Sequence, residues 1–173
     1  DLYHRHNPDE PAGITKMQRL KDSNIYRDVD ATVDLLRKHP DVLGDRIGIT
    51  GFCMGGRVAY MMSGINPAIK AAAVFYGTDP SSSWGGGPTP IELTADIHCP
   101  ILGLFGELDR NPTVDDVNNL ENALANHEKT YKFCVYPDTG HAFMREGTDY
   151  FREGPAKDAW GQLMDWFGKY LSA

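Results

Sequence analysis

The chain has 173 residues, a length that fits one compact domain with a real apolar core. Its 24 acidic and 17 basic side chains give a formal net charge of −7, and the lysines and arginines are scattered rather than clustered. This distribution argues against a nucleic-acid partner, which requires a basic stripe. The 41% apolar fraction indicates a globular chain rather than a disordered one. No apolar run approaches the ~20 residues that span a bilayer, so we expect a soluble, cytoplasmic protein without a membrane partner.

The cysteines and glycines limit the kinds of site that the chain can hold. Cys53, Cys99 and Cys134 are an odd number at wide spacings, so we expect no disulfide framework and at least one free thiol. The cysteines and histidines show no paired metal-ligand spacing. The glycines form neither the G-x-G-x-x-G nor the G-K-[ST] pattern of nucleotide sites. We therefore expect no metal and no cofactor.

The first half of the chain predicts a helix, a strand, a tight turn and a second helix. The first helix has apolar residues at steps of three and four: Ile25, Val29, Val33 and Leu36. Ser23 or Asn24 is expected to cap this helix, and Pro40 lies just past its end. Residues 46–50 predict a short buried strand, and residues 51–56 lead into a helix with its own apolar face: Val58, Met61, Met62 and Ile65. One face of each helix should lie on a sheet.

The middle of the chain predicts two central strands and another helix. The apolar runs at 71–76 and 101–105 are nearly continuous, as expected for strands covered on both faces. Asn111 offers an N-cap, and Pro112 would take the first helical position after it. The helix that follows has a clear buried stripe: Val114, Val117, Leu120 and Leu124.

The end of the chain completes an alternating pattern. Residues 131–136 predict the last strand, and a closing amphipathic helix follows with these apolar residues: Ala156, Trp160, Leu163, Met164, Phe167 and Leu171. Four strands alternate with four helices, which is typical of parallel strands joined by crossover helices. The Gly/Ser/Pro-rich stretch at 81–90 is too short for a linker, so we expect one α/β domain over residues 1–173. No strand precedes the first helix, and we expect N-terminal sequence to be missing.

The sharpest local motif is Gly51-Phe52-Cys53-Met54-Gly55-Gly56, between a buried strand and a helix. Such a turn holds one side chain in a strained, exposed position, and Gly51 and Gly55 are expected to leave room for strand and helix to approach closely. The thiol would lie at a helix N-terminus, which favours the thiolate. Cys53 is therefore a candidate nucleophile; the alternative is a small buried cysteine in a glycine-rich turn.

Two further candidates follow later strands. Asp109 should emerge at the carboxyl end of the 101–105 strand, where catalytic groups of open α/β sheets gather. Its alternative role is a helix cap or turn former, and Glu107 is a competing acid. His141 comes in the loop directly after the last strand, with Asp138 as an alternative acid nearby. Both loops should meet at one edge of the sheet.

The candidates occur in the order nucleophile, acid, histidine, which is the order of the α/β-hydrolase arrangement. In that arrangement the imidazole of His141 takes the thiol proton of Cys53, and the carboxylate of Asp109 fixes the tautomer of the imidazole. The backbone N–H of Met54 helps to hold the developing oxyanion. Three features together favour a hydrolytic Cys-His-Asp triad: the order of the candidates along the chain, their placement after strands, and the tight turn at Cys53, called the nucleophile elbow.

With these residues the chain resembles the dienelactone hydrolases, the carboxymethylenebutenolidase-like enzymes of the α/β-hydrolase superfamily. The cysteine in place of the usual serine at the elbow is the specific part of the match. The resemblance covers nearly the whole chain and rests on these segments: Gly51 to Gly56, Phe75-Tyr76-Gly77, Asp109, and Gly140-His141-Ala142-Phe143.

The resemblance implies hydrolysis of a small ester or enol-lactone that carries a carboxylate, through an acyl intermediate on Cys53. In the family two arginines bind the substrate carboxylate, and residues 2–5 and 141–145 align with the segments that carry them. Arg5 and Arg145 are thus the carboxylate-binding candidates, since a guanidinium offers a bidentate fork to a carboxylate. Tyr76 is a further substrate-binding candidate by the same resemblance.

The resemblance also implies an α/β-hydrolase fold that is truncated at the N-terminus, with a mostly parallel sheet and helices on both faces. Family members begin several dozen residues earlier. The absent part would carry the strand beside the elbow strand, the loop with the second oxyanion donor, and a glutamate that interacts with the resting cysteine.

Two other interpretations compete with the hydrolase. A cysteine-elbow amidotransferase expects a His-x-Glu pair after its last strands, whereas His141 is followed by Ala142 and Phe143. A domain of a different class would be a non-catalytic remnant that pairs the exposed edge of the 46–50 strand with another chain or with another copy, which would give a homo-oligomer.

Overall fold

The computed structural model describes residues 2–6, 9 and 13–172 of the chain. Its centre is a parallel sheet whose strands lie side by side in chain order: β1 (Ile47–Phe52), β2 (Ile69–Phe75), β3 (Ile101–Gly106) and β4 (Tyr131–Tyr136). The four parallel strands confirm the expected α/β class, with β1 and β4 at the two edges of this sheet.

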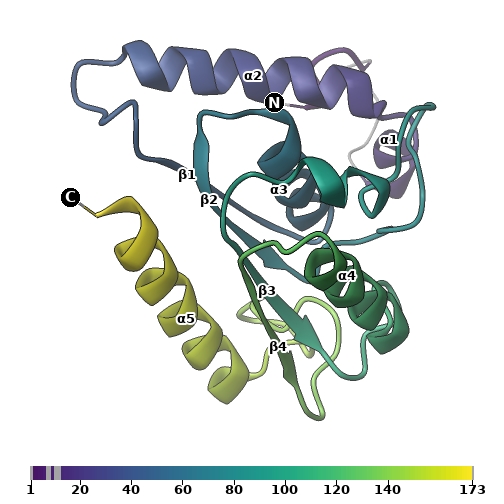
Figure 1. The fold of residues 1–173 in the computed structure, drawn as a ribbon. Helices are drawn as coiled ribbons and strands as arrows, with labels where there is room; N and C mark the ends of the chain where they lie inside the picture. Colours follow the sequence, from purple (N-terminus) through teal and green to yellow (C-terminus); the bar gives the residue numbers. More distant parts are fainter. Residues whose placement is uncertain (1, 7–8, 10–12, 173) are drawn as a thin grey trace.

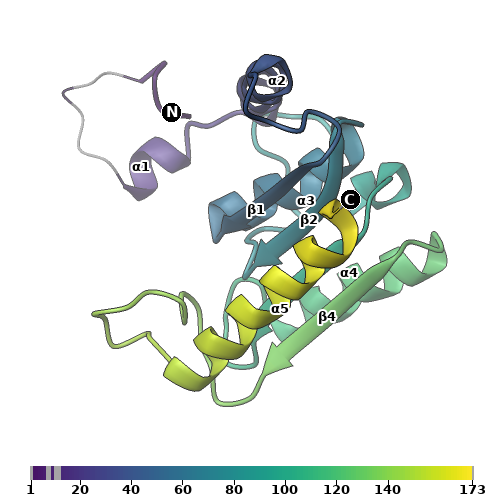
Figure 2. The ribbon, with the colours of Figure 1, turned by 90° about the vertical axis from the view of Figure 1, so that its left-hand side faces the viewer.

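Helices cover both faces of the sheet, as Figures 1 and 2 show. Along the chain the helices are α1 (Ile14–Met17), α2 (Asp22–Lys38), α3 (Met54–Ile65), the 3-10 turn η1 (Glu92–Asp96), α4 (Val114–Asn126) and α5 (Glu153–Leu171). The last helix, α5, lies alone on one face, and α2, α3 and α4 lie on the other. Because side chains alternate along a strand, β2 supplies Ala72 and Val74 to one core, and Ala71, Ala73 and Phe75 to the other.

Two helix starts differ from the predictions. The first long helix begins at Asp22, one residue before the expected caps, and Lys21 caps it without a side-chain hydrogen bond. The side chain of Asp22 is buried instead. The cap of α4 is Thr113 rather than Asn111: the Thr113 hydroxyl accepts from the Asp116 N–H at 3.2 Å, and the Asp116 carboxylate accepts from the Thr113 N–H at 2.9 Å. The helix begins after Thr113 because a capping box satisfies two backbone N–H groups, whereas a single cap residue satisfies one.

Other differences concern short elements and one helix face. The prediction missed α1 and η1, which are too short for a helical period to be visible. In α5 the expected stripe was wrong at two places, because Trp160 and Met164 are 51% and 57% exposed. The buried residues of this helix are Ala156, Ala159, Leu163 and Trp166.

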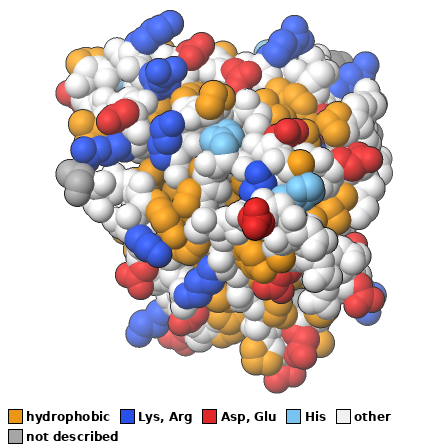
Figure 3. Space-filling view, viewed as in Figure 1, with side chains coloured by type: hydrophobic (Ala, Val, Ile, Leu, Met, Phe, Trp, Pro, Cys, Tyr) orange, Lys and Arg blue, Asp and Glu red, His pale blue; other side chains and the backbone are white. Residues whose placement is uncertain are grey.

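The face of the molecule seen in Figure 1 carries both signs of charge. Figure 3 shows Lys and Arg side chains interspersed with Asp and Glu on the face seen in Figure 1. No helix among the described residues is both long and apolar enough to cross a membrane.

Candidate active site

The turn from β1 to α3 holds Cys53 in an uncommon backbone conformation. Its φ is 57° and its ψ −121°, and α3 begins at the next residue. A side chain at Gly51 would overlap the carbonyl of Gly55, and a Cβ at Gly56 would lie 2.7 Å from the carbonyl oxygen of Phe75. Close approach therefore requires the glycines at 51 and 56. The expectation for Gly55 itself was wrong, because a Cβ there meets nothing within 4 Å.

The loops after β3 and β4 bring His141 and Asp109 into contact. The Nδ1 atom of His141 lies 2.7 Å from Oδ2 of Asp109, whose side chain is only 1% exposed. Since a carboxylate oxygen accepts, Nδ1 carries the proton and Nε2 is left for another partner. Of the two competing acids, Glu107 has a different partner: its carboxylate accepts from the backbone N–H of Asp138 at 3.1 Å.

The thiol and the imidazole shift each other's protonation. A hydrogen bond to His141 lowers the pKa of the Cys53 thiol; burial opposes this, while the charge of His141 and the backbone N–H of Met54 lower the pKa further. Burial also acts to lower the pKa of His141, but hydrogen bonds to Asp109 and Cys53 outweigh it and raise the pKa to about 9. The arrangement favours a thiolate beside an imidazolium.

The thiol pKa values of the other two cysteines are shifted in the opposite direction. Burial raises the pKa of Cys99 to about 12, and burial also raises the pKa of Cys134 above its ordinary value. All three cysteines are free of disulfides. Only Cys53 therefore combines partial exposure with a lowered thiol pKa.

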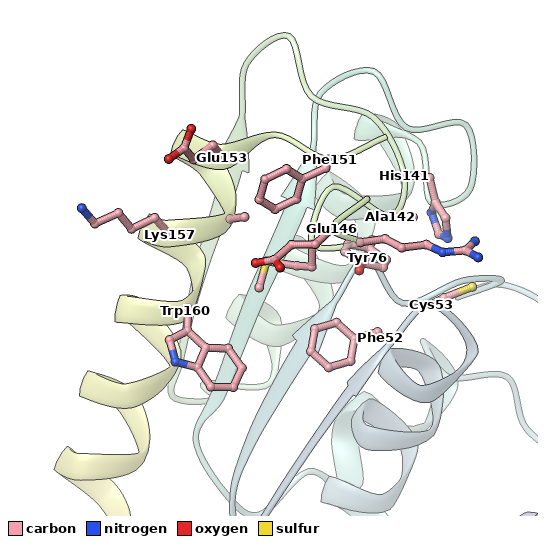
Figure 4. Close-up of a pocket in the computed structure, with 13 residues that line it drawn as sticks. Phe52, Cys53, Tyr76, His141, Ala142, Glu146, Phe151, Glu153, Lys157 and Trp160 are labelled. Atoms are coloured by element: carbon pink, nitrogen blue, oxygen red, sulfur yellow. The ribbon is translucent and has the colours of Figure 1, made fainter. Parts of the chain in front are cut away.

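Cys53 and His141 line a cavity of about 930 Å³, which lies between the carboxyl ends of the strands and α5. Figure 4 shows the rings of Phe52 and Trp160 on opposite sides of it, with Phe151 above them. The lining is mainly apolar with a few charged groups: Phe52, Cys53, Tyr76, His141, Ala142, Met144, Arg145, Glu146, Phe151, Glu153, Ala156, Lys157 and Trp160. Such a concave, aromatic wall suits a small organic ligand.

The structure places Tyr76 and Arg145 at this cavity and Arg5 outside its lining. The Tyr76 ring meets the His141 ring edge-on at a centroid distance of 4.9 Å. Burial, together with the nearby charge of Cys53, raises the pKa of Tyr76 to about 12, so its hydroxyl stays protonated. Both terminal nitrogens of Arg5 lie 2.6 Å from the carboxylate of Asp28, so this arrangement does not support a substrate role for Arg5.

Sequence reasoning missed most of the cavity wall. The motif around Cys53 contains Phe52 but gives no sign that its ring contacts a ligand. The helical pattern predicts Trp160 in the buried stripe of the last helix. Neither position has a local signal for ligand contact, because exposure depends on which helix covers the end of the sheet. The expected roles of Cys53, Met54, Asp109 and His141 rest on motifs, and the structure brings these residues together.

Comparison with known proteins places the chain in a family. The sequence model of the "Dienelactone hydrolase family" matches residues 1–171. A "Putative carboxymethylenebutenolidase" of Methylorubrum extorquens is 36% identical over 155 residues, which are 89% of this chain and 53% of that protein. A Bradyrhizobium protein named "Probable 2-oxo-3-(5-oxofuran-2-ylidene)propanoate lactonase" is 31% identical, over 92% of this chain and 67% of its own length.

A solved structure agrees with these sequence matches. The crystal structure of a "Putative Dienelactone Hydrolase" from Klebsiella pneumoniae superimposes with a TM-score of 0.89 at 31% identity, covering 98% of this chain and 73% of that one. The chain spans between about half and two thirds of the length of the curated relatives it matches. The match over residues 1–171 shows that the chain belongs to the dienelactone hydrolase family.

Proposed function

We propose that this chain hydrolyses esters or enol-lactones by covalent catalysis at Cys53. The observation that carries the proposal is geometric: Cys53 on its strained turn opens onto the same cavity as His141, whose Nδ1 lies 2.7 Å from Asp109. The lowered pKa of the Cys53 thiol supports it. His141 acts as the proton carrier, and Asp109 fixes its tautomer and stabilises its charged form. The backbone N–H of Met54, which lowers the pKa of the Cys53 thiol, is proposed to donate one hydrogen bond to the oxyanion.

The proposed reaction has two steps of acyl transfer. The Cys53 thiolate attacks the acyl carbon and forms a C–S bond, and the collapse of the tetrahedral intermediate breaks the bond to the leaving oxygen, which takes the proton from His141 Nε2. A water then attacks the thioester and gives a proton to His141. The carboxylic acid leaves, and the thiolate and the imidazolium are restored.

The proposed substrate is a small lactone or ester with a carboxylate. The exposed Arg145 lines a cavity that is otherwise mostly apolar and aromatic, and its guanidinium can pair with a carboxylate. The name of the Bradyrhizobium relative describes a lactone that carries a propanoate group. Tyr76, buried against His141, is proposed to line the acyl side of the site.

Replacing Arg145 by alanine is expected to weaken a carboxylate-bearing ester selectively. Loss of a charge-assisted hydrogen bond is worth ~1.5–3 kcal/mol, which corresponds to a rise in KM of roughly 10–150-fold. The matched neutral methyl ester serves as the internal control and should keep its KM. Steady-state kinetics with both esters measure the ratio, and an equal loss on both would remove the carboxylate role. The same comparison on Arg5→Ala tests the second arginine.

Alkylation tests the proposed nucleophile without knowledge of the substrate. At pH 7 we expect iodoacetamide to modify Cys53 at least about tenfold faster than Cys99 or Cys134, whose pKa values are raised by burial. Mass spectrometry of peptides after brief exposure gives the three rates in one sample. His141→Ala should slow the Cys53 reaction, and a Cys53 no faster than Cys134 would overturn the assignment.

The three free thiols also bear on the compartment. A thiolate nucleophile is readily oxidised and must stay reduced to react. We therefore propose a cytoplasmic location, where thiols are kept reduced.

A second candidate function is association of two copies through the edge of the sheet. Among the described residues β1 pairs with β2 alone. An unpaired strand edge is a template for pairing. Native mass measured by light scattering decides the matter, since a monomer at micromolar concentration excludes this role.

A further inference from the structure

The loop after β2 and the loop after β3 are joined by a reciprocal pair of hydrogen bonds. The backbone N–H of Asp79 donates to Oδ1 of Asn111 at 2.9 Å, and the amide Nδ2 of Asn111 donates to Oδ1 of Asp79 at 2.7 Å. The backbone of Asp79 has φ 50°, a left-handed conformation that costs energy outside glycine. The two hydrogen bonds therefore hold the two loops together.

One end of this contact reaches the proposed triad. The backbone N–H of Asn111 donates to Oδ1 of Asp109 at 2.9 Å, while Oδ2 of the same carboxylate lies 2.7 Å from Nδ1 of His141. The two oxygens of Asp109 thus have separate partners. Rotation of the carboxylate away from His141 would break the contact to Asn111 as well.

The other end is anchored in the protein interior by Arg57. Its Nη1 donates to the backbone oxygen of Asp79 at 2.6 Å, and its Nη2 donates to the buried carboxylate of Asp22 at 2.9 Å. The same Asp22 oxygen accepts the backbone N–H of Trp84, so the loop is held at two points. Arg57 also lies one helical turn after Cys53, and its backbone N–H donates to the Cys53 carbonyl at 3.1 Å. A continuous set of contacts therefore runs from the elbow helix to the triad acid.

We propose that Asp79 and Asn111 are positioning residues: their mutual hydrogen bonds hold the loop after β3 so that Asp109 presents Oδ2 to His141. This inference rests on the proposed function for its effect on turnover. Its effect on His141 is independent of any substrate. The sequence offers no motif for the pair, because the two residues are 32 positions apart.

The test uses variants that remove the contact without straining the backbone. Asp79→Gly keeps the positive φ and deletes the acceptor, and Asn111→Ala deletes both side-chain contacts. Asp79→Asn is the rescue variant, since asparagine tolerates the left-handed region and retains an amide oxygen as acceptor. Asn24→Ala is the control, because Asn24 is a half-buried asparagine on α2, away from the proposed triad, whose side-chain oxygen accepts from Arg27.

Two readouts in the single variants separate positioning from a merely structural role. In Asp79→Gly and in Asn111→Ala we expect kcat to fall about tenfold with KM unchanged, because an orienting hydrogen bond is lost and substrate contacts are not. The pKa of His141, followed by NMR titration of its ring, should fall by about one unit. The titratable groups in contact with this ring are Cys53, Asp109 and Tyr76, and the variants leave all three in place.

The pair should also show non-additivity. The double variant should be no worse than the single ones, because the second substitution removes a contact already lost. Asp79→Asn should return kcat to within about twofold, and Asn24→Ala should behave as the unaltered protein. An unmoved His141 titration, or additive losses in the double variant, would overturn the inference.

The outcomes distinguish this inference from the proposed function. If Cys53→Ala keeps its hydrolysis while the His141 titration still moves in Asp79→Gly, the nucleophile is misassigned and the positioning stands. If Cys53→Ala is inactive and the His141 titration does not move, the positioning fails and the hydrolase stands. Should Asp79→Gly not fold, the exposed Asn111→Ala alone decides the result by the same NMR titration.

Discussion

Hydrolysis of p-nitrophenyl acetate is expected to fall by at least about 10⁴-fold when Cys53 is replaced by alanine, because the acyl acceptor is removed while the rest of the site remains. Cys53 lies half-buried at the start of α3, so the loss of its sulfur leaves the strained turn and the contact between His141 and Asp109 in place. Initial rates at pH 7.5, with circular dichroism to verify folding, measure the effect. Full activity of this variant would show that another residue is the nucleophile.

Two companion variants define what the sulfur contributes. Cys134→Ala removes a half-buried cysteine that does not line the cavity, and its activity should match that of the unaltered protein. Cys53→Ser keeps a nucleophilic atom on the same turn but not a thiolate at neutral pH, so we expect an activity between the other two. Activity of Cys134→Ala as low as that of Cys53→Ala would point to damage unrelated to the reaction.

The pH profile of the unaltered protein should be bell-shaped. The contact with His141 lowers the pKa of Cys53, so the thiolate forms below the ordinary thiol range and the rate rises on the acidic side. The rate should fall on the alkaline side as His141, with its pKa raised to about 9, loses the proton that the leaving group needs. Measuring kcat/KM from pH 5 to 10 tests both limbs. A profile that is flat through pH 9 would contradict the proton role of His141.

The sheet and the order of its elements could be predicted from the sequence because the signals are local. Apolar runs of strand length alternate with helical periods, and the strand at 131–136 has the predicted bounds. The turn at Cys53 could also be predicted, because a strand, a glycine-flanked cysteine and a helix follow each other within a few residues. The acid and the histidine could be placed since the carboxyl ends of parallel strands meet at one edge.

Features that depend on distant partners could not be read in this way. Asp22 looks like an ordinary residue before a helix, yet it is buried against Arg57, 35 positions away. Asn111 looks like a helix cap, and its side chain is held by Asp79 instead. Trp160 fits a helical apolar stripe but lines the cavity and is largely exposed. Local patterns record periodicity, whereas partner choice is settled by tertiary packing.

The buried pair of Arg57 and Asp22 gives the largest expected change in stability. Their side chains are 0% and 2% exposed, and the guanidinium also lies 4.5 Å from the ring centroid of Trp84. Arg57→Met fills a similar volume but removes the guanidinium, so the Asp22 carboxylate stays buried and keeps the hydrogen bond from the backbone N–H of Trp84. Breaking such a pair costs about 3–5 kcal/mol of unfolding free energy. Urea titration should show the midpoint lowered at an unchanged slope.

The chain offers a matched control in the pair of Arg5 and Asp28. Both pairs have short contacts between a guanidinium and an aspartate, but Arg5 lies at the surface, where water screens the charges. Arg5→Met should therefore lower the midpoint far less than Arg57→Met. Adding Asp22→Asn to Arg57→Met removes the orphaned charge and keeps an acceptor for Trp84, so roughly half of the lost stability should return. Equal effects of the two arginine substitutions would show that burial does not set the value of the interior pair.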